Sequence, residues 1–131
     1  MICPLKIISS NSAGVISKIS KNISFENSKS RFIYHITAVI VNNFTNHLIV
    51  KSQQIIKSNN LNFEFLYPII KETIKKTEVM SALEAQTGPA KRNDKITIEK
   101  HIDFLKKYDA EKLYREISDS IINTNFIKDE L

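Results

Sequence analysis

The stretch from residue 28 to residue 57 constrains the fold most, because it predicts one long helix that is apolar on nearly all sides. On a helical wheel at about 100° per residue, the remaining face is a narrow stripe of polar or small residues. The members of this stripe are Arg31, His35, Ala38, Asn42, Thr45 and Asn46. A helix of this kind is normally buried, and buried polar groups must be paired or face a water-filled cleft. Structural pairing and a ligand-facing cleft therefore both stay open.

Two residues of the stripe are candidates for chemistry. His35 is its only member that titrates near neutral pH, which makes it the candidate acid or base. Arg31 is one of three arginines in the chain, and its planar guanidinium suits a carboxylate or phosphate. A lone histidine is more often a core residue with its hydrogen bond satisfied, and His47 and Asn43 are expected on other faces. No histidine and carboxylates stand at ligand spacing, so we expect no metal site.

Apolar residues recur at helical spacing through most of the chain, so the predicted fold class is all-α, a helical bundle. Besides 28–57, the expected helices are 12–23, 62–77, one starting at Asp94 or Thr97, and a last one capped by Asp109. Pro68 should lie in the first turn of its helix or kink it. The exception is the apolar run over residues 4–8, which predicts one short buried strand.

Composition excludes several classes of protein. With 131 residues, 42% hydrophobic and 25% charged, the chain should be one soluble globular domain. No signal peptide or apolar run of about 18 residues is present, so we expect a cytoplasmic protein without membrane contact. The net charge of +5 comes from dispersed lysines, so nucleic acid is not expected as a partner. The C-terminal KDEL is interpreted as coincidence, because that address needs a signal peptide.

The low glycine content excludes the common nucleotide-binding motifs. Gly14 and Gly88 are the only glycines of the sequence. The dinucleotide fingerprint needs three closely spaced glycines, and a phosphate-binding P-loop needs two within six residues. We therefore expect this chain to bind no cofactor alone. The one cysteine, Cys3, excludes an intrachain disulfide and is a poor nucleophile candidate near the terminus.

The segment EAQTGPAKRND, residues 84–94, is the second unusual feature of the sequence. Gly88 and Pro89 predict a turn, and Asp94 is placed to cap the following helix. A plain turn gives no reason for three further residues. They are Gln86, Thr87 and Arg92.

Three segments together resemble the C-terminal helical domain of one protein family. They are RFIYHITAVIVNNFTNHL, LNFEFLYPIIKETIKK and AQTGPAKRNDKITIEKHIDFL, followed by Leu113 and Tyr114. The family consists of Rossmann-like proteins related to pyrroline-5-carboxylate reductase and labelled NAD(P)-dependent oxidoreductases. Their second domain has no known function and is similar to the C-terminal dimerisation domain of 6-phosphogluconate dehydrogenase. The resemblance covers about residues 4–122.

The resemblance implies an organisation and a site. Residues 1–24 would be the end of a Rossmann domain, 25–124 a helical substrate and dimerisation domain, and 125–131 a flexible tail. NAD(P) would serve the intact family, and the reaction would take place between the two domains, where loop 84–94 would face the polar stripe. The implied catalytic residues are His35 and Arg31. The implied substrate-binding residues are Asn42, Thr45, Asn46, Gln86, Thr87, Gly88, Arg92 and Asp94.

The leading hypothesis is therefore a substrate and dimerisation half without its cofactor domain, inactive alone and forming a homodimer. Related hydroxyacid dehydrogenases carry a catalytic lysine on the long helix, whereas the stripe here has none. One alternative is half of a split reductase that a separate Rossmann chain completes. Another is a stand-alone helical module that binds a small anion through Arg31 and Arg92. The identity of the small-molecule substrate is not predicted.

Overall fold

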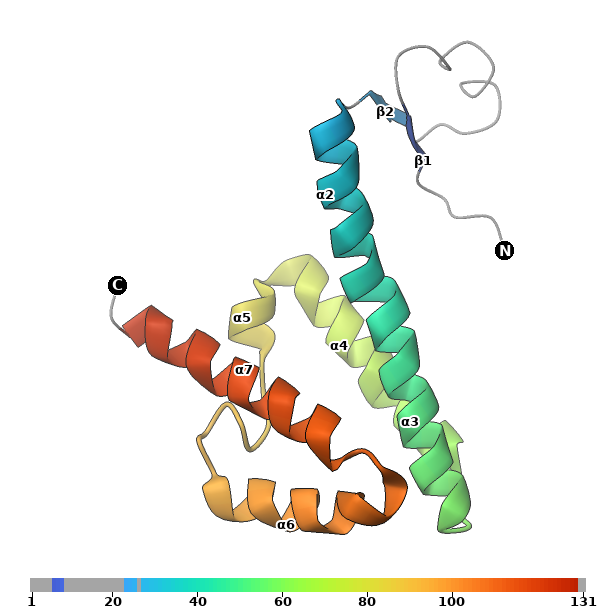
Figure 1. The fold of residues 1–131 in the computed structure, drawn as a ribbon, viewed down its shortest axis with the longest axis vertical. Helices are drawn as coiled ribbons and strands as arrows, with labels where there is room; N and C mark the ends of the chain where they lie inside the picture. The colour runs from blue at the N-terminus through green and yellow to red at the C-terminus, as the bar shows by residue number, and fades with distance from the viewer. Residues whose placement is uncertain (1–5, 9–22, 26, 130–131) are drawn as a thin grey trace. The chain divides into compact units, whose positions relative to one another are not determined.

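The computed structural model describes residues 6–8, 23–25 and 27–129 of the chain, which divides into two compact units. The first unit is Met1–Val50 and the second is Lys51–Leu131. Figure 1 shows the order of their helices and strands. The boundary lies inside a helix, whereas the sequence places a domain boundary near residue 24.

Two short strands in the first unit form a parallel pair. Strand β1 is Lys6–Ile8 and strand β2 is Ile23–Phe25, with Lys6 opposite Ile23. Parallel neighbours need a connection of a dozen or more residues, as in proteins of the α/β class. The strand predicted at residues 4–8 is thus confirmed in its described part. β2 is not predicted: the helix expected over 12–23 would have reached Ile23, and its residues 12–22 lie outside the described ones.

The predicted long helix is confirmed, with one irregularity. It consists of α2 (Ser28–Ala38), a π-helical segment η2 (Val39–Phe44) and α3 (Thr45–Ser58), one directly after another. Asn27 caps the start, because its side-chain oxygen accepts a hydrogen bond from the Ser30 amide at 2.9 Å. The sequence does not predict η2.

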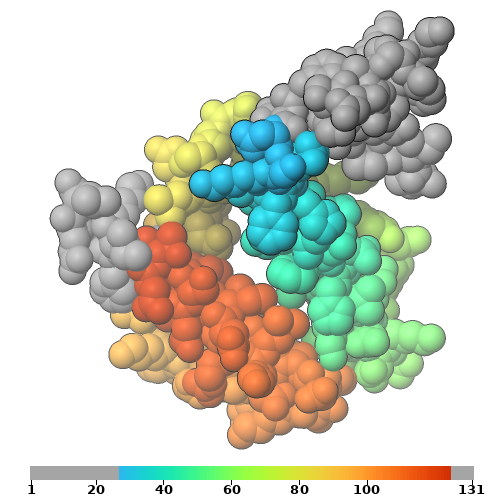
Figure 2. Space-filling model, turned by 45° about the horizontal axis from the view of Figure 1, so that its top comes forward, coloured from blue at the N-terminus to red at the C-terminus, as the bar shows by residue number. Residues whose placement is uncertain are grey.

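The expected burial of this helix is not found within the first unit. Phe32 is 64% exposed, Val41 70% and Phe44 56%. The α2 segment, blue to cyan in Figure 2, contributes to the surface drawn there. A helix that is apolar on most sides needs covering surfaces on most sides. The described residues of the first unit do not supply them.

In the first half of the second unit, the starts of the helices follow from residues close by in the sequence. A 3-10 turn η3 (Phe63–Leu66) leads into α4 (Tyr67–Val79), and Pro68 lies in the first turn of α4, as predicted. The expected loop 80–94 contains a short helix α5 (Ala82–Ala85). Ser81 and Glu84 form its capping box, in which each side chain accepts a hydrogen bond from the other residue's backbone amide.

Two helices complete the second unit and lie side by side (Figure 1). Helix α6 (Lys95–Leu105) is capped by Asp94, which accepts a hydrogen bond from the Thr97 amide at 3.0 Å. Asp94, not Thr97, is therefore the cap. A 3-10 turn η4 (Lys106–Tyr108) connects to α7 (Glu111–Asp129).

Two expectations at the ends of α7 are corrected. Asp109 does not cap this helix, because it ends η4 in a left-handed conformation with a φ of 50° and lies two residues before Glu111. At the other end the helix continues to Asp129, although the sequence predicts a flexible tail from residue 125.

A small core lies between α6 and α7. Ile102 is 3% exposed and Ile98 6%, and Ala90 packs with them. Tyr114, Ile121 and Ile122 pack against this core. The end of α3 is hydrogen-bonded to η4, the turn after α6. Asn59, which follows α3, donates through Nδ2 to the Tyr108 hydroxyl at 2.6 Å. None of the described helices is both long enough and apolar enough to cross a membrane.

Candidate functional site

The site residues implied by the sequence fall into two groups. The helix group lies on α2, η2 and the start of α3, in the first unit. The loop group lies on residues 86–94, in the second unit. The expected contact between loop and stripe stays a prediction, because the two groups belong to different units.

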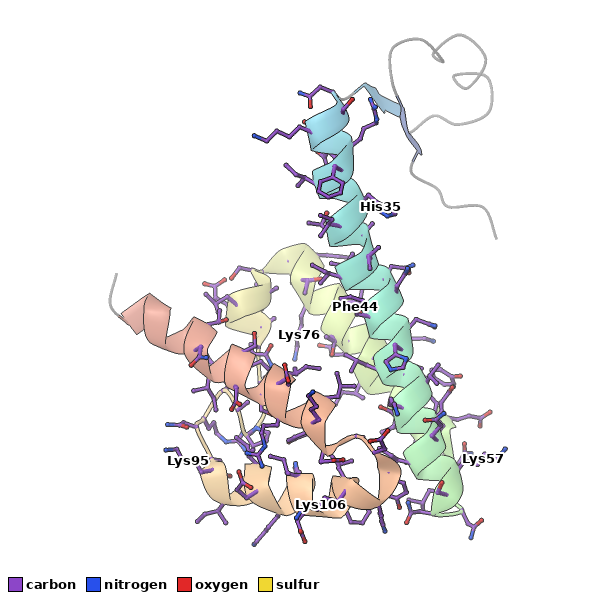
Figure 3. The ribbon with its side chains drawn as sticks, in the orientation of Figure 1. His35, Phe44, Lys57, Lys76, Lys95 and Lys106 are labelled. Carbon is purple, nitrogen blue, oxygen red and sulfur yellow. The ribbon has the colours of Figure 1, made fainter. Side chains whose placement is uncertain are left out.

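The helix group makes local hydrogen bonds. Arg31 Nη2 donates to Ser28 Oγ at 3.2 Å, and Asn42 Nδ2 donates to Asn43 Oδ1 at 3.0 Å. His35 is exposed, and Figure 3 shows its side chain projecting outward from α2. The imidazole is thus accessible for proton exchange with a ligand or with water.

The π-helical segment changes which residues share a face with His35. A π-turn takes about one residue more than an α-turn, so the residues after it are rotated by roughly 100° relative to a regular α-helix. This rotation turns Thr45 away from the side of Arg31 and His35. The residues expected near that side are Asn42, Asn43, Asn46 and His47. A wheel drawn at a constant angle misses Asn43 and His47 for this reason.

The loop group contains residues with clear structural roles. Gly88 has a φ of 105°, which side-chain-bearing residues rarely adopt, so the turn predicted there is confirmed. The Pro89 carbonyl accepts hydrogen bonds from the amides of Arg92 and Asp94, at 3.2 and 2.9 Å. The hydrogen bonds from the side chain and backbone of Thr97 lower the pKa of Asp94. Gly88 and Asp94 therefore shape the loop and start α6.

Gln86 and Thr87, which the turn does not explain, line a pocket of about 310 Å³ in the second unit. We call it the α4–α5 pocket. Its other lining residues are Ile69, Glu72, Thr73, Lys76 and Thr77 from α4, and Ala82 and Ala85 from α5. The Lys76 side chain leaves α4 on the side of α5 (Figure 3).

The polar groups of the α4–α5 pocket form only part of the ion pairs and hydrogen bonds that they can make. Lys76 Nζ and Glu72 Oε1 form a loose ion pair at 3.7 Å, with both side chains about half exposed. Thr73 Oγ1 donates to the Ile69 carbonyl at 2.9 Å, and a threonine oxygen that donates can still accept. Gln86 Nε2 donates to the Thr87 carbonyl at 2.8 Å, which directs its donor group into the loop itself.

The α4 residues of this pocket were missed from the sequence. Glu72 and Lys76 stand four residues apart, which is the usual spacing of a solvent-exposed ion pair on a helix. In the sequence, only Gln86 and Thr87 of the other wall stand out, because a plain turn does not explain them. The fold of α4 back onto α5 is what joins the two sets.

A third polar cluster joins α6 to α7. His101 Nδ1 lies 2.7 Å from the Tyr114 hydroxyl, with the two rings edge to face. Burial raises the pKa of the Tyr114 hydroxyl, and a hydrogen bond with Ser118 opposes this in part. The contact between His101 and Tyr114 links α6 to α7. In the described part of the chain, no cluster of His, Cys, Asp and Glu is arranged to hold a metal ion.

Comparison with known proteins identifies the family. Residues 10–121 match the model of a domain of unknown function, DUF2520. The chain belongs to the DUF2520 family. No curated protein matches it.

The chain is also similar to a solved structure. The DUF2520 chain is similar to a crystal structure of a protein from Bacteroides fragilis named "putative NADP oxidoreductase". The two are 33% identical with a TM-score of 0.81, over 88% of this chain and 46% of that one. The present chain thus spans about half the length of that protein. The all-α fold expected from the resemblance is confirmed, because the chain matches the helical part of that protein.

Proposed function

We propose that this chain is the helical substrate and dimerisation part of an NAD(P)-dependent oxidoreductase. The observation that carries the proposal is the match to the Bacteroides fragilis protein, at a TM-score of 0.81 over 88% of the chain. The parallel pair of β1 and β2 directly before α2 adds support, because parallel strands with long connections are typical of α/β domains.

The connection from β2 to α2 does not fit a dinucleotide. β2 is followed by α2 after only Glu26 and Asn27, and no glycine stands in this connection. A Rossmann site needs a glycine-rich turn there, so that the backbone can approach the pyrophosphate. In the proposal the nucleotide is therefore held by a Rossmann domain on the same or on a separate polypeptide.

The exposed apolar faces of α2 and η2 support a partner surface. Soluble proteins rarely leave large apolar patches in water, and such patches mark interaction sites. Phe32, Val41 and Phe44 lie within thirteen residues of one helix and are all more than half exposed. In the proposal a second copy of the chain covers part of this surface and makes a homodimer.

The polar stripe supplies the proposed site residues. His35 would exchange a proton with the substrate, since its side chain is exposed and histidine is the side chain used most often as a general acid or base. Arg31 lies one helical turn before it and would hold an anionic substrate group. Asn42 and Asn46 would add hydrogen bonds on the same side.

Sequencing and co-purification test the proposal. The DNA around the Met1 codon should encode a polypeptide with the glycine fingerprint, either in frame or as a neighbouring gene. If it is a separate gene, the tagged 131-residue chain should retain its product through affinity purification. A genome in which no such sequence accompanies this chain, or two products that fail to copurify, would refute the proposal.

A further inference from the structure

The α4–α5 pocket has the size and the lining of a site for a small ligand. Its volume of about 310 Å³ is at the lower end of the range for small-molecule sites, which is roughly 300–1,000 Å³. Ile69, Ala82 and Ala85 give it an apolar part, while Glu72 and Lys76 place one charge of each sign in its lining. An apolar surface with a few convergent polar groups is the usual composition of a binding site.

The two charges restrict which ligand fits. An anion that approaches Lys76 is repelled by Glu72, and a cation that approaches Glu72 is repelled by Lys76. A ligand with both a negative and a positive group is attracted by both residues. The spacing of 3.7 Å between Lys76 Nζ and Glu72 Oε1 suits a ligand whose own charges are equally close together.

The ion pair between Glu72 and Lys76 is loose enough for each residue to pair with a ligand instead. At 3.7 Å it is longer than a well-formed charge-assisted hydrogen bond, and both side chains remain about half exposed. Thr73 and Thr77 of the lining donate their hydroxyl protons to backbone carbonyls of α4, so their oxygens can only accept a hydrogen bond from a ligand. Acceptors on this wall favour an ammonium group beside Glu72.

We propose that the α4–α5 pocket binds a free α-amino acid with a small aliphatic side chain. Its carboxylate pairs with Lys76, its ammonium group pairs with Glu72, and its side chain lies against Ile69, Ala82 and Ala85. The proposal is independent of the oxidoreductase function, because binding at these residues requires neither a nucleotide nor a Rossmann domain.

NMR titration of the ¹⁵N-labelled 131-residue chain tests the proposal with three forms of one compound. L-Valine keeps both charges, N-acetyl-L-valine keeps only the negative charge, and L-valine methyl ester keeps only the positive one. L-Valine should give saturable shifts at the amides of Thr73, Lys76, Gln86 and Thr87, with a Kd of about 1 mM. Each blocked form should bind at least about tenfold more weakly, since it loses one charged contact.

Variants locate the binding on α4. Lys76→Met and Glu72→Gln should each weaken L-valine binding by about tenfold. Lys75→Met is the matched control, because Lys75 is an exposed lysine of the same helix outside the pocket lining, and it should leave the Kd unchanged. Circular dichroism confirms that each variant is folded. The proposal is overturned if L-valine gives no saturable shifts, if a blocked form binds as well, or if Lys75→Met weakens binding as much as Lys76→Met.

Discussion

Replacement of Ile102 by alanine tests whether the α6–α7 core holds the second unit together. Ile102 is 3% exposed and contacts Ile98 and Ala90 in the core cluster. The substitution removes three buried carbon atoms, worth about 0.8 kcal/mol each in transfer free energy, or about 2.4 kcal/mol together. A cavity term brings the expected loss in the free energy of unfolding to about 3 kcal/mol. That is a large part of the roughly 5–15 kcal/mol that stabilises a whole domain.

The matched control is Ile96→Ala, on the same helix. Ile96 is 73% exposed, so its side chain has little burial to lose and the variant should differ from the parent by less than about 0.5 kcal/mol. Urea unfolding followed by far-UV circular dichroism measures both variants. Equal losses for Ile96→Ala and Ile102→Ala would refute the assignment of the core to this face of α6.

Three further predictions concern the loop and the long helix. Gly88→Ala should cost about 1–2 kcal/mol in unfolding free energy through backbone strain alone, since nothing lies within 4 Å of the added Cβ. Asp94→Ala should lower the melting temperature at neutral pH. The pKa of Asp94 is lowered in the folded chain, so the stability that its carboxylate adds is present above the ordinary value of 3.8. This stability is lost as the pH falls through the lowered pKa, and below the lowered pKa the melting curves of the variant and the parent should coincide. Val41→Asp should convert a dimer to a monomer in sedimentation velocity, whereas Val79→Asp, at an equally exposed position on α4, should not.

Local chemistry made much of the second unit predictable from sequence. Asp94 caps α6, Pro68 lies in the first turn of α4, and Gly88 takes the positive φ of its turn. Each of these signals acts within a few residues, so no knowledge of the rest of the fold is needed. The α5 helix was also readable in principle, because Ser81 and Glu84 stand at capping-box spacing.

Non-local features were missed. The strand β2 exists through pairing with β1, and three residues alone do not specify a strand. The π-helical segment over Val39–Phe44 has no propensity signal, yet it changes which side chains share a face with His35. The apolar pattern of the long helix predicted burial, and the exposed side chain of Val41 shows that the first unit does not supply the covering surface.

The candidate site was predictable only in part. Gln86 and Thr87 were identified because a plain turn leaves them unexplained, and the structure places both in the lining of a pocket. Their neighbours Glu72 and Lys76 look like an ordinary surface ion pair in the sequence. Only the return of the chain from α4 through α5 brings these residues together.

The most direct test of the central claim is calorimetric titration of NADPH into two proteins. One is the 131-residue chain alone, and the other is a chimera in which this chain replaces the matched part of the Bacteroides fragilis protein. We expect no measurable NADPH binding to the chain alone and a Kd in the micromolar range, about −8 kcal/mol, for the chimera. Micromolar binding of NADPH to the chain alone would contradict this expectation.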